Sequence, residues 1–275
     1  MYNLADLHTH TNYSDGALAP YELIKKAQSV GLSIISITDH DTVGSLEEAV
    51  ECGKEFDVEV ITGMELSANV GDLEIHILGY FIDYHHPELL DALTLFREER
   101  VKRVERILHK LSKMNVSLSM ESVLANASGD SIGRPHIATA LVREGHAESY
   151  HDAFSKSIGE GRPAYEKKLE FSPEESVRLI AEAEGLSFLA HPGRWIDDEL
   201  LSELIKSGLD GIEVVHPSHS PERVQHYRGV VNEYCLLECG GSDFHGGMKR
   251  DDDVFGKVGI PIDRVEIMRR RLFSD

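Results

Sequence analysis

Short apolar runs rich in β-branched residues alternate along this chain with longer stretches in which apolar residues recur every three or four positions. The short runs predict buried strands, and the longer stretches predict helices that pack one face on a core. Because strands and helices alternate, the pattern predicts right-handed βαβ units, a parallel sheet and an α/β fold. The predicted strands are Ala5–Thr11, Ser33–Thr38, Glu59–Met64, Glu74–Phe81, Ser187–Ala190, Gly211–Val215, Cys235–Cys239 and Lys257–Ile260. The helices predicted between them are Ala19–Gly31, Ser45–Phe56, Ser172–Glu184, Asp197–Ser207 and Pro221–Glu233.

The alternation is interrupted in the middle of the chain. One long helical pattern, two shorter ones and a polar loop with several glycines replace it there. We therefore expect residues 1–86 and 172–275 to form a barrel of about seven βα units. Residues 87–171 are expected to form a helical insertion that covers the active-site face of the barrel. The parts of this insertion are predicted at Pro87–Asn115, Met120–Asn126, Pro135–Glu144 and Ser157–Lys168.

Length and composition suit one α/β barrel, because 275 residues with 41% hydrophobic content can bury a substantial core. No stretch reaches the roughly 18 uncharged apolar residues that a membrane span needs. The N-terminus has no basic region followed by an apolar run, so we expect no secretory signal, no membrane association and a cytoplasmic location. The net charge of −20 disfavours duplex DNA and other long polyanions. A small phosphorylated substrate remains compatible, since bound divalent ions would reverse the local field.

Three cysteines, at positions 52, 235 and 239, are an odd count in a long chain and argue against a disulfide framework. The spacing of Cys235 and Cys239 also allows a zinc site. Because their segment is apolar and the chain has no second pair, we expect these thiols to be buried in a strand.

Histidines and carboxylates follow most of the predicted strands. His8 and His10 lie two apart on a strand, so their imidazoles point to the same side, where one metal ion can accept both. The carboxyl ends of parallel barrel strands converge on one face, so the side chains that follow them should meet there. The sequence therefore predicts a metal cluster. The other residues at or near strand ends are Asp15, His40, Glu65, His76, His191, His216, Asp243 and His245. The histidines interpreted as ordinary core or surface residues are His85, His86, His109, His146, His151 and His226.

These motifs together resemble the signature blocks of the PHP family, the polymerase and histidinol phosphatase superfamily. The motifs are His8-Thr9-His10, Ser14-Asp15-Gly16, Thr38-Asp39-His40-Asp41, Gly63-Met64-Glu65, His191-Pro192 and Ser242-Asp243-Phe244-His245. The resemblance covers both halves of the chain outside the insertion and implies a distorted (β/α)7 barrel with three divalent ions. It implies one ion held by His8, His10, Glu65 and Asp243, a second by Glu65, His76 and His191, and a third by Asp15, His40 and His245.

Two further segments, Ile132–Ala138 and Gly211–Ser220, resemble the bacterial branch of this family that hydrolyses phosphate from nucleotide ends. The resemblance implies nucleoside 3′,5′-bisphosphates and short 5′-phosphorylated RNA as substrates. Arg134 would then clamp a substrate phosphate, to which a guanidinium is well suited, or alternatively make an ion pair at a helix start. Arg194 is a second candidate for phosphate binding.

Phosphoester hydrolysis requires an activated water and neutralisation of phosphate charge, and two or three clustered divalent ions supply both through a metal-activated hydroxide. Nitrogen and oxygen ligands without thiolate favour Mn²⁺, with Fe²⁺ or Zn²⁺ as alternatives. His216 and His219 are candidate catalytic residues that bind phosphate or protonate the leaving oxygen, and His216 is also a candidate for substrate binding. The alternative is that both only order their loop. Asp6 and Asp39 are expected to orient imidazoles from behind the metal ligands.

Three alternatives to a nucleotide phosphoesterase remain. Histidinol phosphate is the second substrate, because the same metal core serves it. An amidohydrolase barrel also begins with two histidines on its first strand, but it commonly uses a carboxylated lysine where Glu65 stands here. A non-catalytic barrel is the third alternative, although such modules lose ligands and this chain lacks none of the nine. The sequence predicts no oligomeric state.

Overall fold

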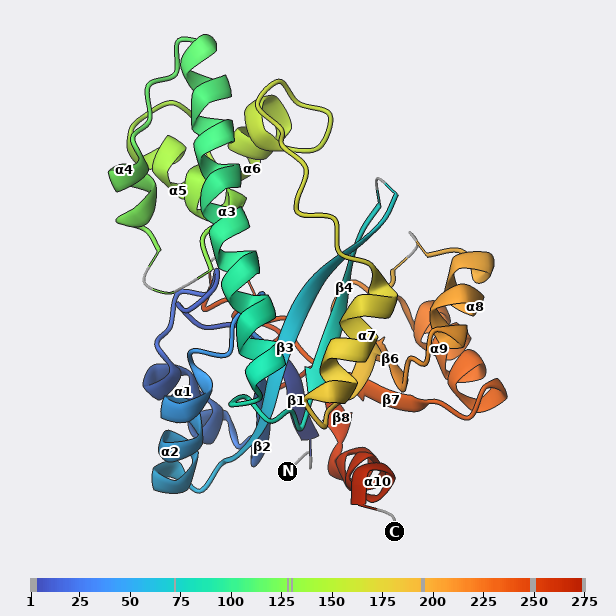
Figure 1. Cartoon of the computed structure of the whole chain (residues 1–275). Coiled ribbons are helices and arrows are strands. Elements are labelled where there is room, and N and C mark those ends of the chain that lie inside the picture. The colour runs from blue at the N-terminus through green and yellow to red at the C-terminus, as the bar shows by residue number, and fades with distance from the viewer. Residues whose placement is uncertain are drawn as a thin grey trace.

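The computed structural model describes residues 4–71, 73–127, 129, 131–193, 196–247 and 251–273. Within these residues, eight strands form a nearly closed barrel, and ten α-helices and one π-helical turn surround it or rise from it (Figure 1). The strands are β1 Leu4–Thr9, β2 Ile34–Ile37, β3 Glu59–Val70, β4 Leu73–Tyr80, β5 Leu186–Leu189, β6 Gly211–Val215, β7 Leu237–Gly240 and β8 Ile260–Pro261. The helices are α1 Pro20–Val30, α2 Leu46–Phe56, α3 Pro87–Lys113, α4 Met120–Leu124, α5 Arg134–Arg143, α6 Tyr150–Ala153, η1 Phe154–Ile158, α7 Pro173–Glu182, α8 Asp198–Lys206, α9 Pro221–Glu233 and α10 Ile262–Phe273.

The sheet runs in the order β7-β6-β5-β4-β3-β2-β1-β8, and the loop after β1 closes the barrel against the loop after β7. At this seam the backbone N–H of His10 donates to the carbonyl of Phe244 over 2.9 Å. Strands β1 to β3 are mutually parallel, as are β5 to β7. The predicted α/β barrel with a helical insertion is therefore confirmed.

The prediction of a wholly parallel sheet is wrong at β4, which is antiparallel to both β3 and β5. β3 continues six residues beyond Met64 and pairs Val70 with Leu73 at the far end of a hairpin. Two residues cannot hold a crossover helix, whereas they suffice for an antiparallel turn. Gly71, with φ +59°, has the left-handed backbone that such a turn favours.

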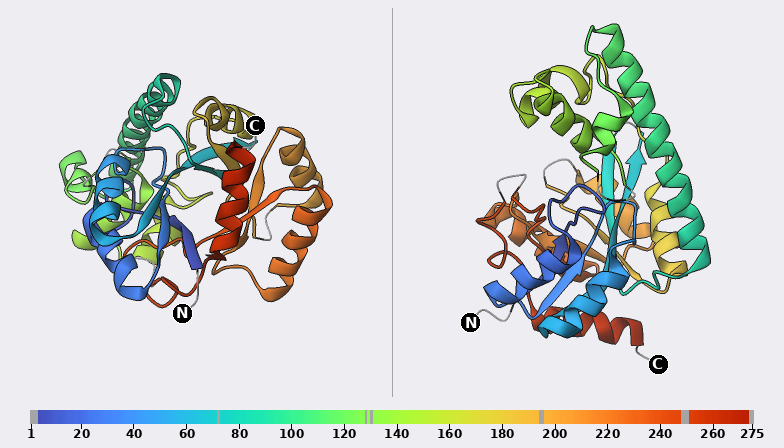
Figure 2. Two further views of the ribbon diagram at one scale, coloured as in Figure 1. Left: turned by 90° about the horizontal axis from the view of Figure 1, so that it is seen from below. Right: turned by 90° about the vertical axis from the view of Figure 1, so that its left-hand side faces the viewer.

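Helices cover the outside of the barrel and bury a continuous apolar cluster against it, as the view from below shows (Figure 2). The start of α7 illustrates how local sequence fixes an element. Ser172 Oγ accepts from the backbone N–H of Glu175 over 3.1 Å, and Glu175 Oε2 accepts from the N–H of Ser172 over 2.8 Å. This reciprocal capping box satisfies two donors that the first helical turn would otherwise leave unpaired.

Residues 87–171 form a lobe that rises beyond one end of the barrel (Figures 1 and 2). Helix α3 runs along the barrel and extends past its rim, where α4, α5, α6 and η1 pack against it around a separate apolar cluster. The lobe is fastened to the barrel by a buried ion pair between Arg100 of α3 and Asp41 of the loop after β2.

Some elements differ from the sequence predictions. Helix α10 and the α6–η1 segment were not predicted. The strand expected from Cys235 begins at Leu237, because Cys235 is exposed and has a φ of +54°, while Cys239 is buried as expected. In the described part of the chain, no helix is both long and apolar enough to cross a membrane.

Candidate metal centre

All nine predicted metal ligands lie on the barrel face beneath the lobe. Strand β1 carries His8 and leads into His10, β3 carries Glu65 and β4 carries His76. The remaining ligands lie in the loops that follow strands or, for Asp15, in the loop between β1 and α1. These loop residues are Asp15, His40, His191, Asp243 and His245.

Glu65 is fully buried at the centre of the cluster. Its Oε1 lies 2.8 Å from His76 Nδ1 and 3.0 Å from His191 Nε2. Its Oε2 lies 3.3 Å from the Nε2 atoms of both His8 and His10. His40 Nδ1 also lies 3.1 Å from Oε2. Because the two oxygens face different imidazoles, Glu65 could bridge two ions.

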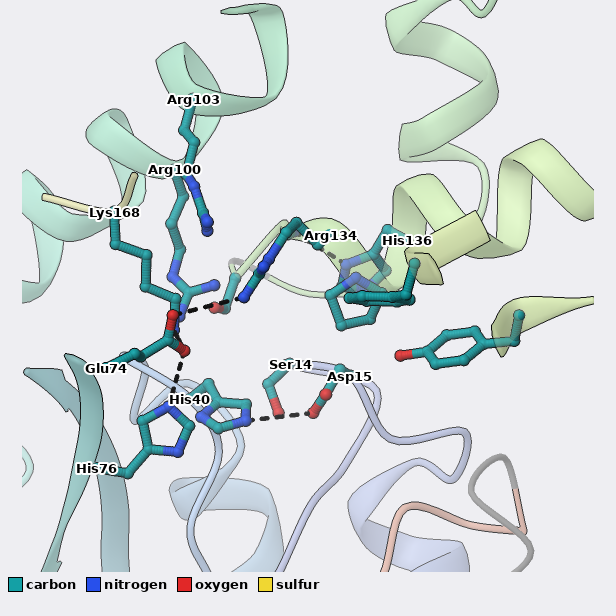
Figure 3. Close-up of a pocket in the computed structure, with 15 residues that line it drawn as sticks. Ser14, Asp15, His40, Glu74, His76, Arg100, Arg103, Arg134, His136 and Lys168 are labelled. Carbon is teal, nitrogen blue, oxygen red and sulfur yellow. Dashed lines mark hydrogen bonds and ion pairs between the residues drawn. The ribbon is translucent and has the colours of Figure 1, made fainter. Parts of the chain in front are cut away.

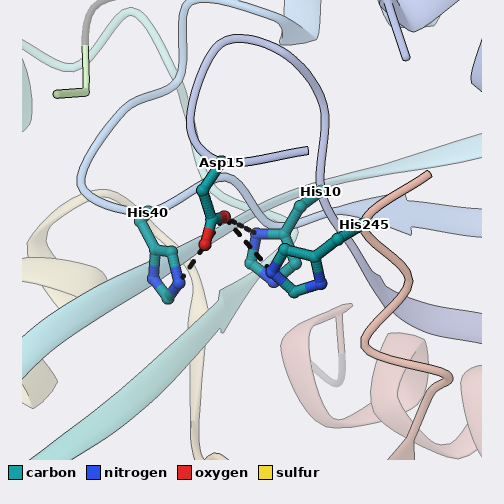
Figure 4. Close-up of side chains that lie close together, drawn as sticks. All are labelled: His10, Asp15, His40 and His245. Atoms are coloured by element: carbon teal, nitrogen blue, oxygen red, sulfur yellow. Dashed lines mark ion pairs between the residues drawn. The ribbon is translucent and has the colours of Figure 1, made fainter. Parts of the chain in front are cut away.

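Asp243 and Asp15 provide carboxylates on the other sides of His10. Asp243 Oδ1 lies 3.1 Å from His10 Nε2 and 3.4 Å from His8 Nε2. Asp15 Oδ1 lies 3.2 Å from His245 Nε2 and 3.8 Å from His10 Nδ1. Figure 4 shows Asp15 between His40 on one side and His10 and His245 on the other.

The cluster contains four groups of residues, and within each group the potential ligand atoms all lie within 4.8 Å of one another. Together they contain every one of the nine predicted ligands. The groups are His10, Asp15, His40 and His245; His8, His10 and Asp243; His8, Glu65 and His191; and His40, Glu65 and His76. The last two groups differ from the expected division. His191 is grouped with His8 rather than with His76, and His40 lies near Glu65, at 3.1 Å, as well as near Asp15, at 3.9 Å.

The donor atoms of this cluster fit divalent cations. Within the described residues, the buried Nδ1 atoms of His10, His40 and His76 make no hydrogen bond. Burial lowers the pKa of His40 well below its usual value, so its ring is neutral and offers a lone pair. Burial would raise the pKa of Glu65, but the surrounding imidazoles outweigh it and hold this pKa well below the usual range. Burial would also lower the pKa of His8 and His76, but the carboxylates around these two rings outweigh it. They raise the pKa of His8 well above its usual value and that of His76 to about 9, so a bound cation would displace protons from these rings. Imidazole nitrogens around ionised carboxylates are the ligand set that Mn²⁺, Fe²⁺ and Zn²⁺ accept.

The PHP domain family matches residues 6–183. The chain belongs to the PHP family. It is 32% identical over 246 residues to a 5′-3′ exoribonuclease of Haemophilus influenzae, covering 87% of this chain and 89% of that protein. It is 31% identical over 262 residues to a 3′,5′-nucleoside bisphosphate phosphatase of Chromobacterium violaceum, covering 93% and 92%. A solved structure from Bifidobacterium adolescentis, named for a metal-dependent phosphoesterase, superposes with a TM-score of 0.90 at 32% identity and covers 97% of this chain and 96% of that one.

Family membership makes this protein a metal-dependent phosphoesterase, and the predictions of family and enzyme class are confirmed. In this PHP chain, Glu213 of β6 supports the metal ligands from behind. It is fully buried, its Oε1 lies 2.9 Å from His8 Nδ1, and its Oε2 accepts from the backbone N–H of His191 over 2.7 Å. Glu213 is not among the predicted site residues, although a glutamate inside an apolar strand is a signal for such a role. Because Glu213 binds Nδ1 of His8, the other ring nitrogen of His8, Nε2, points toward the cluster.

Asp6 and Asp39 act on loops rather than on imidazoles, which corrects the expectation for both. Asp6 accepts hydrogen bonds from the N–H and hydroxyl of Ser242, over 2.9 and 2.6 Å, and so anchors the loop that carries Asp243. Asp39 accepts from the N–H of Thr11 over 2.8 Å and from the hydroxyl of Ser14, and so fixes the loop that carries Asp15. Both oxygens of each carboxylate accept hydrogen bonds, and neither residue belongs to a group of potential metal ligands in the described part of the chain.

His216 and His219 lie near each other but differ in their free atoms. His216 Nδ1 accepts from the backbone N–H of Ser218 over 3.1 Å, and its Nε2 lies 3.5 Å from Asp243 Oδ2. A neutral ring with an accepting Nδ1 carries its proton on Nε2, which faces the cluster. Both nitrogens of His219 are instead bonded to backbone groups, the carbonyl of Val214 and the N–H of Gly193. This geometry argues against the catalytic role expected of His219 and favours its ordering of the loop.

A cavity of about 290 Å³ lies between the metal cluster and the lobe. His40, His76 and Asp15 form its lower side in Figure 3, and basic side chains approach from above. These basic residues are Arg100, Arg103, Arg134 and Lys168. We call this cavity with its four cations the basic chamber. Arg194, the second predicted phosphate ligand, lies outside the described residues.

The cations of the basic chamber differ in how they are neutralised. Arg100 pairs with Asp41, and both Arg134 and Lys168 contact Glu74. Arg103 is 4% exposed and gives two N–H groups to the carbonyl of Glu166, and among the described residues no carboxylate lies within ion-pair distance of it. Burying a guanidinium is costly unless an anion neutralises it, so an anion that entered the chamber would interact favourably with Arg103.

Proposed function

We propose that this PHP phosphoesterase hydrolyses phosphate from nucleotide ends, with nucleoside 3′,5′-bisphosphates and short 5′-phosphorylated RNA as substrates. The observation that carries the proposal is the basic chamber, which opens directly onto the metal cluster. A substrate with two phosphate groups can place one beside the cluster and the other among the cations. The names of the relatives from Haemophilus influenzae and Chromobacterium violaceum support this substrate class.

The nine candidate ligands would hold two or three divalent ions, and we propose Mn²⁺ because the set contains imidazole and carboxylate but no thiolate. When bound, such ions lower the pKa of water and neutralise charge on phosphate oxygens. In this proposal Glu65 would bridge two ions, at the position where amidohydrolases commonly have a carboxylated lysine. Lys168 bonds to Glu74 and Ser67 instead, which disfavours the amidohydrolase alternative.

His216 would protonate the leaving oxygen or bind a substrate phosphate. Its Nε2 faces the cluster and carries the proton in the neutral ring, while Ser218 fixes the orientation of that ring. An imidazole is suited to this step because its pKa lies near neutral pH.

Arg134 and Lys168 would hold the second phosphate, and Arg103 would complete its neutralisation. Arg134 is held over the rings of Tyr165 and Phe154, at 5.4 and 5.8 Å, which restricts its guanidinium before substrate arrives. Histidinol phosphate carries one phosphate only, so it would leave the basic chamber without an anion. The chamber therefore favours the bisphosphorylated substrates.

A phosphate-release assay with Mn²⁺ tests this proposal. We expect rapid release from a nucleoside 3′,5′-bisphosphate, a lower kcat/KM on histidinol phosphate, and nucleotide products from a short 5′-phosphorylated RNA. The same RNA with a 5′-hydroxyl is the matched control and should react poorly, because it has no phosphate for the chamber. Preference for histidinol phosphate, or equal rates with both RNAs, would overturn the substrate assignment.

A further inference from the structure

Glu74 lies where the lobe meets the metal centre. It precedes His76 by two residues on β4, so the alternation of a strand places both side chains on the same face. Its Oε1 lies 3.2 Å from His76 Nε2 and 2.7 Å from Lys168 Nζ. Its Oε2 lies 3.4 Å from Arg134 Nη2. Figure 3 shows the carboxylate of Glu74 between the imidazole below and the cations of the lobe above.

The contact with His76 fixes an imidazole that faces the cluster. Nδ1 of His76 lies 2.8 Å from Glu65 Oε1, so this nitrogen is the one directed at the candidate metal position. The proton of the neutral ring is then on Nε2 and donates to Glu74. A carboxylate behind a metal-binding imidazole sets its tautomer, orients its ring and increases its basicity.

The contacts with Lys168 and Arg134 join two parts of the lobe to the barrel. Arg134 begins α5, and Lys168 belongs to the segment that returns from the lobe to α7. The side chain of Lys168 is 14% exposed and that of Arg134 is 17% exposed. Two buried positive charges that contact the same residue would repel each other unless an anion lay between them. Glu74 is that anion in the structure.

We propose that Glu74 is a positioning residue that fixes His76 for metal binding and holds Lys168 and Arg134 above the same metal position. One carboxylate then links phosphate capture to the metal centre. The part that concerns phosphate rests on the proposed function, whereas the part that concerns metal binding does not.

The first test is Mn²⁺ binding to Glu74→Gln, measured by calorimetry on protein stripped of metal. Loss of a carboxylate behind a ligand histidine commonly weakens metal binding about 10- to 100-fold, and we expect this change for one bound equivalent. Glu166→Gln is the matched control, because Glu166 pairs with Lys110 at 2.8 Å inside the lobe and faces no candidate ligand. It should bind Mn²⁺ as the wild type does.

The second test is a double-mutant cycle on KM for a nucleoside 3′,5′-bisphosphate. Lys168→Met alone should raise KM about tenfold or more and leave Mn²⁺ affinity unchanged, since His76 keeps its partner. In the Glu74→Gln background, Lys168→Met should add less than threefold, because the carboxylate that placed the lysine is already absent. Glu74→Asp, which keeps the charge, should bind Mn²⁺ more tightly than Glu74→Gln.

Wild-type Mn²⁺ affinity in Glu74→Gln, or effects on KM that multiply in the cycle, would overturn the proposal. Loss of cooperative unfolding in Glu74→Gln would also overturn it, in favour of a structural role. If the wild-type protein releases no phosphate from nucleotides, the proposed function fails, and calorimetry with Mn²⁺ still decides the role of Glu74 at the metal centre.

Discussion

At the scale of single residues, the buried arginines differ in whether a carboxylate of the protein neutralises them. Arg100 has its carboxylate partner, whereas Arg103 has only the carbonyl of Glu166 among the described residues. Burial lowers the pKa of Arg103 to about 10, and the nearby Arg134 adds to this effect, yet the guanidinium stays charged at neutral pH. A charge that the protein leaves unpaired next to a candidate metal cluster is best explained by an anionic substrate.

Replacement of Arg103 by methionine should therefore weaken substrate binding. We expect Arg103→Met to raise KM for a nucleoside 3′,5′-bisphosphate by about 10- to 100-fold, the equivalent of a charged hydrogen bond worth roughly 1.5–3 kcal/mol. Steady-state kinetics measures it. Arg106→Met, which removes a half-exposed guanidinium paired with Glu166, is the control and should leave KM unchanged. An unaltered KM in Arg103→Met would remove this residue from the substrate site.

His216 should show the opposite kinetic pattern. Loss of a proton donor lowers kcat by about 10²- to 10⁴-fold, and we expect His216→Gln to do so with little change in bound Mn²⁺. The control is His226→Gln on α9, whose imidazole is 40% exposed and lies 3.9 Å from Asp198. A normal kcat in His216→Gln, measured with metal content checked in the same sample, would exclude His216 as the acid.

The sequence could predict those site residues that stand in short motifs at strand ends. His8 and His10 are an example, because the alternation of a strand alone brings their imidazoles together. Glu213, Glu74 and Lys168 were missed for a different reason. Their roles depend on which element faces which across the barrel rim, and no local pattern in the sequence records that.

At the scale of elements too, local signals in the sequence predict structure well, whereas pairing between elements is not predicted. The helices predicted over Ser172–Glu184 and Pro221–Glu233 follow from local signals, and the structure has them as α7, Pro173–Glu182, and α9, Pro221–Glu233. The hairpin of β3 and β4 was missed because the end of β3 was placed at Met64. The polar residues Ser67 and Asn69 interrupt the apolar pattern beyond Met64, so the pattern did not predict the rest of the strand, which pairs with β4 as far as Val70.

The ion pair between α3 and the loop after β2 should be a major determinant of stability. Asp41 and Arg100 have side chains only 3% and 12% exposed, and Asp41 also accepts from the N–H of Ser67 over 2.7 Å. We expect Asp41→Asn to lower the free energy of unfolding by about 3–5 kcal/mol, since it leaves a buried guanidinium unpaired. Asparagine tolerates the positive φ of this position, so backbone strain does not contribute.

Urea unfolding of metal-free protein gives this measurement. The double variant Asp41→Asn with Arg100→Met should recover part of the loss, because it removes the unpaired charge as well as its partner. If the double variant is less stable than Asp41→Asn alone, Arg100 stabilises the protein through its bond to the carbonyl of Ile132 rather than through the ion pair.

At the scale of the whole molecule, metal binding should act on the barrel and not on the lobe. All nine candidate ligands lie between residues 8 and 76 or between residues 191 and 245, so ions that bind them connect both halves of the barrel. The lobe, residues 87–171, supplies none of them and has its own apolar cluster. Its connection to the metal centre runs through contacts such as those of Glu74 and Asp41.

Saturating Mn²⁺ should therefore stabilise the two units unequally. An ion present at about 100 times its Kd adds roughly 2.7 kcal/mol to the unfolding free energy of whatever must open to release it. We expect hydrogen exchange to slow by about 100-fold in β1, β3 and β7 and to change less than threefold in α4 and α5. Glu65→Gln is the control, because loss of the carboxylate at the centre of the candidate ligands should abolish the protection of the strands. Equal protection of lobe and barrel would mean that they unfold as one cooperative unit, held together by the apolar side chains of α3, Leu89, Leu93 and Phe96, that pack in the cluster of the barrel.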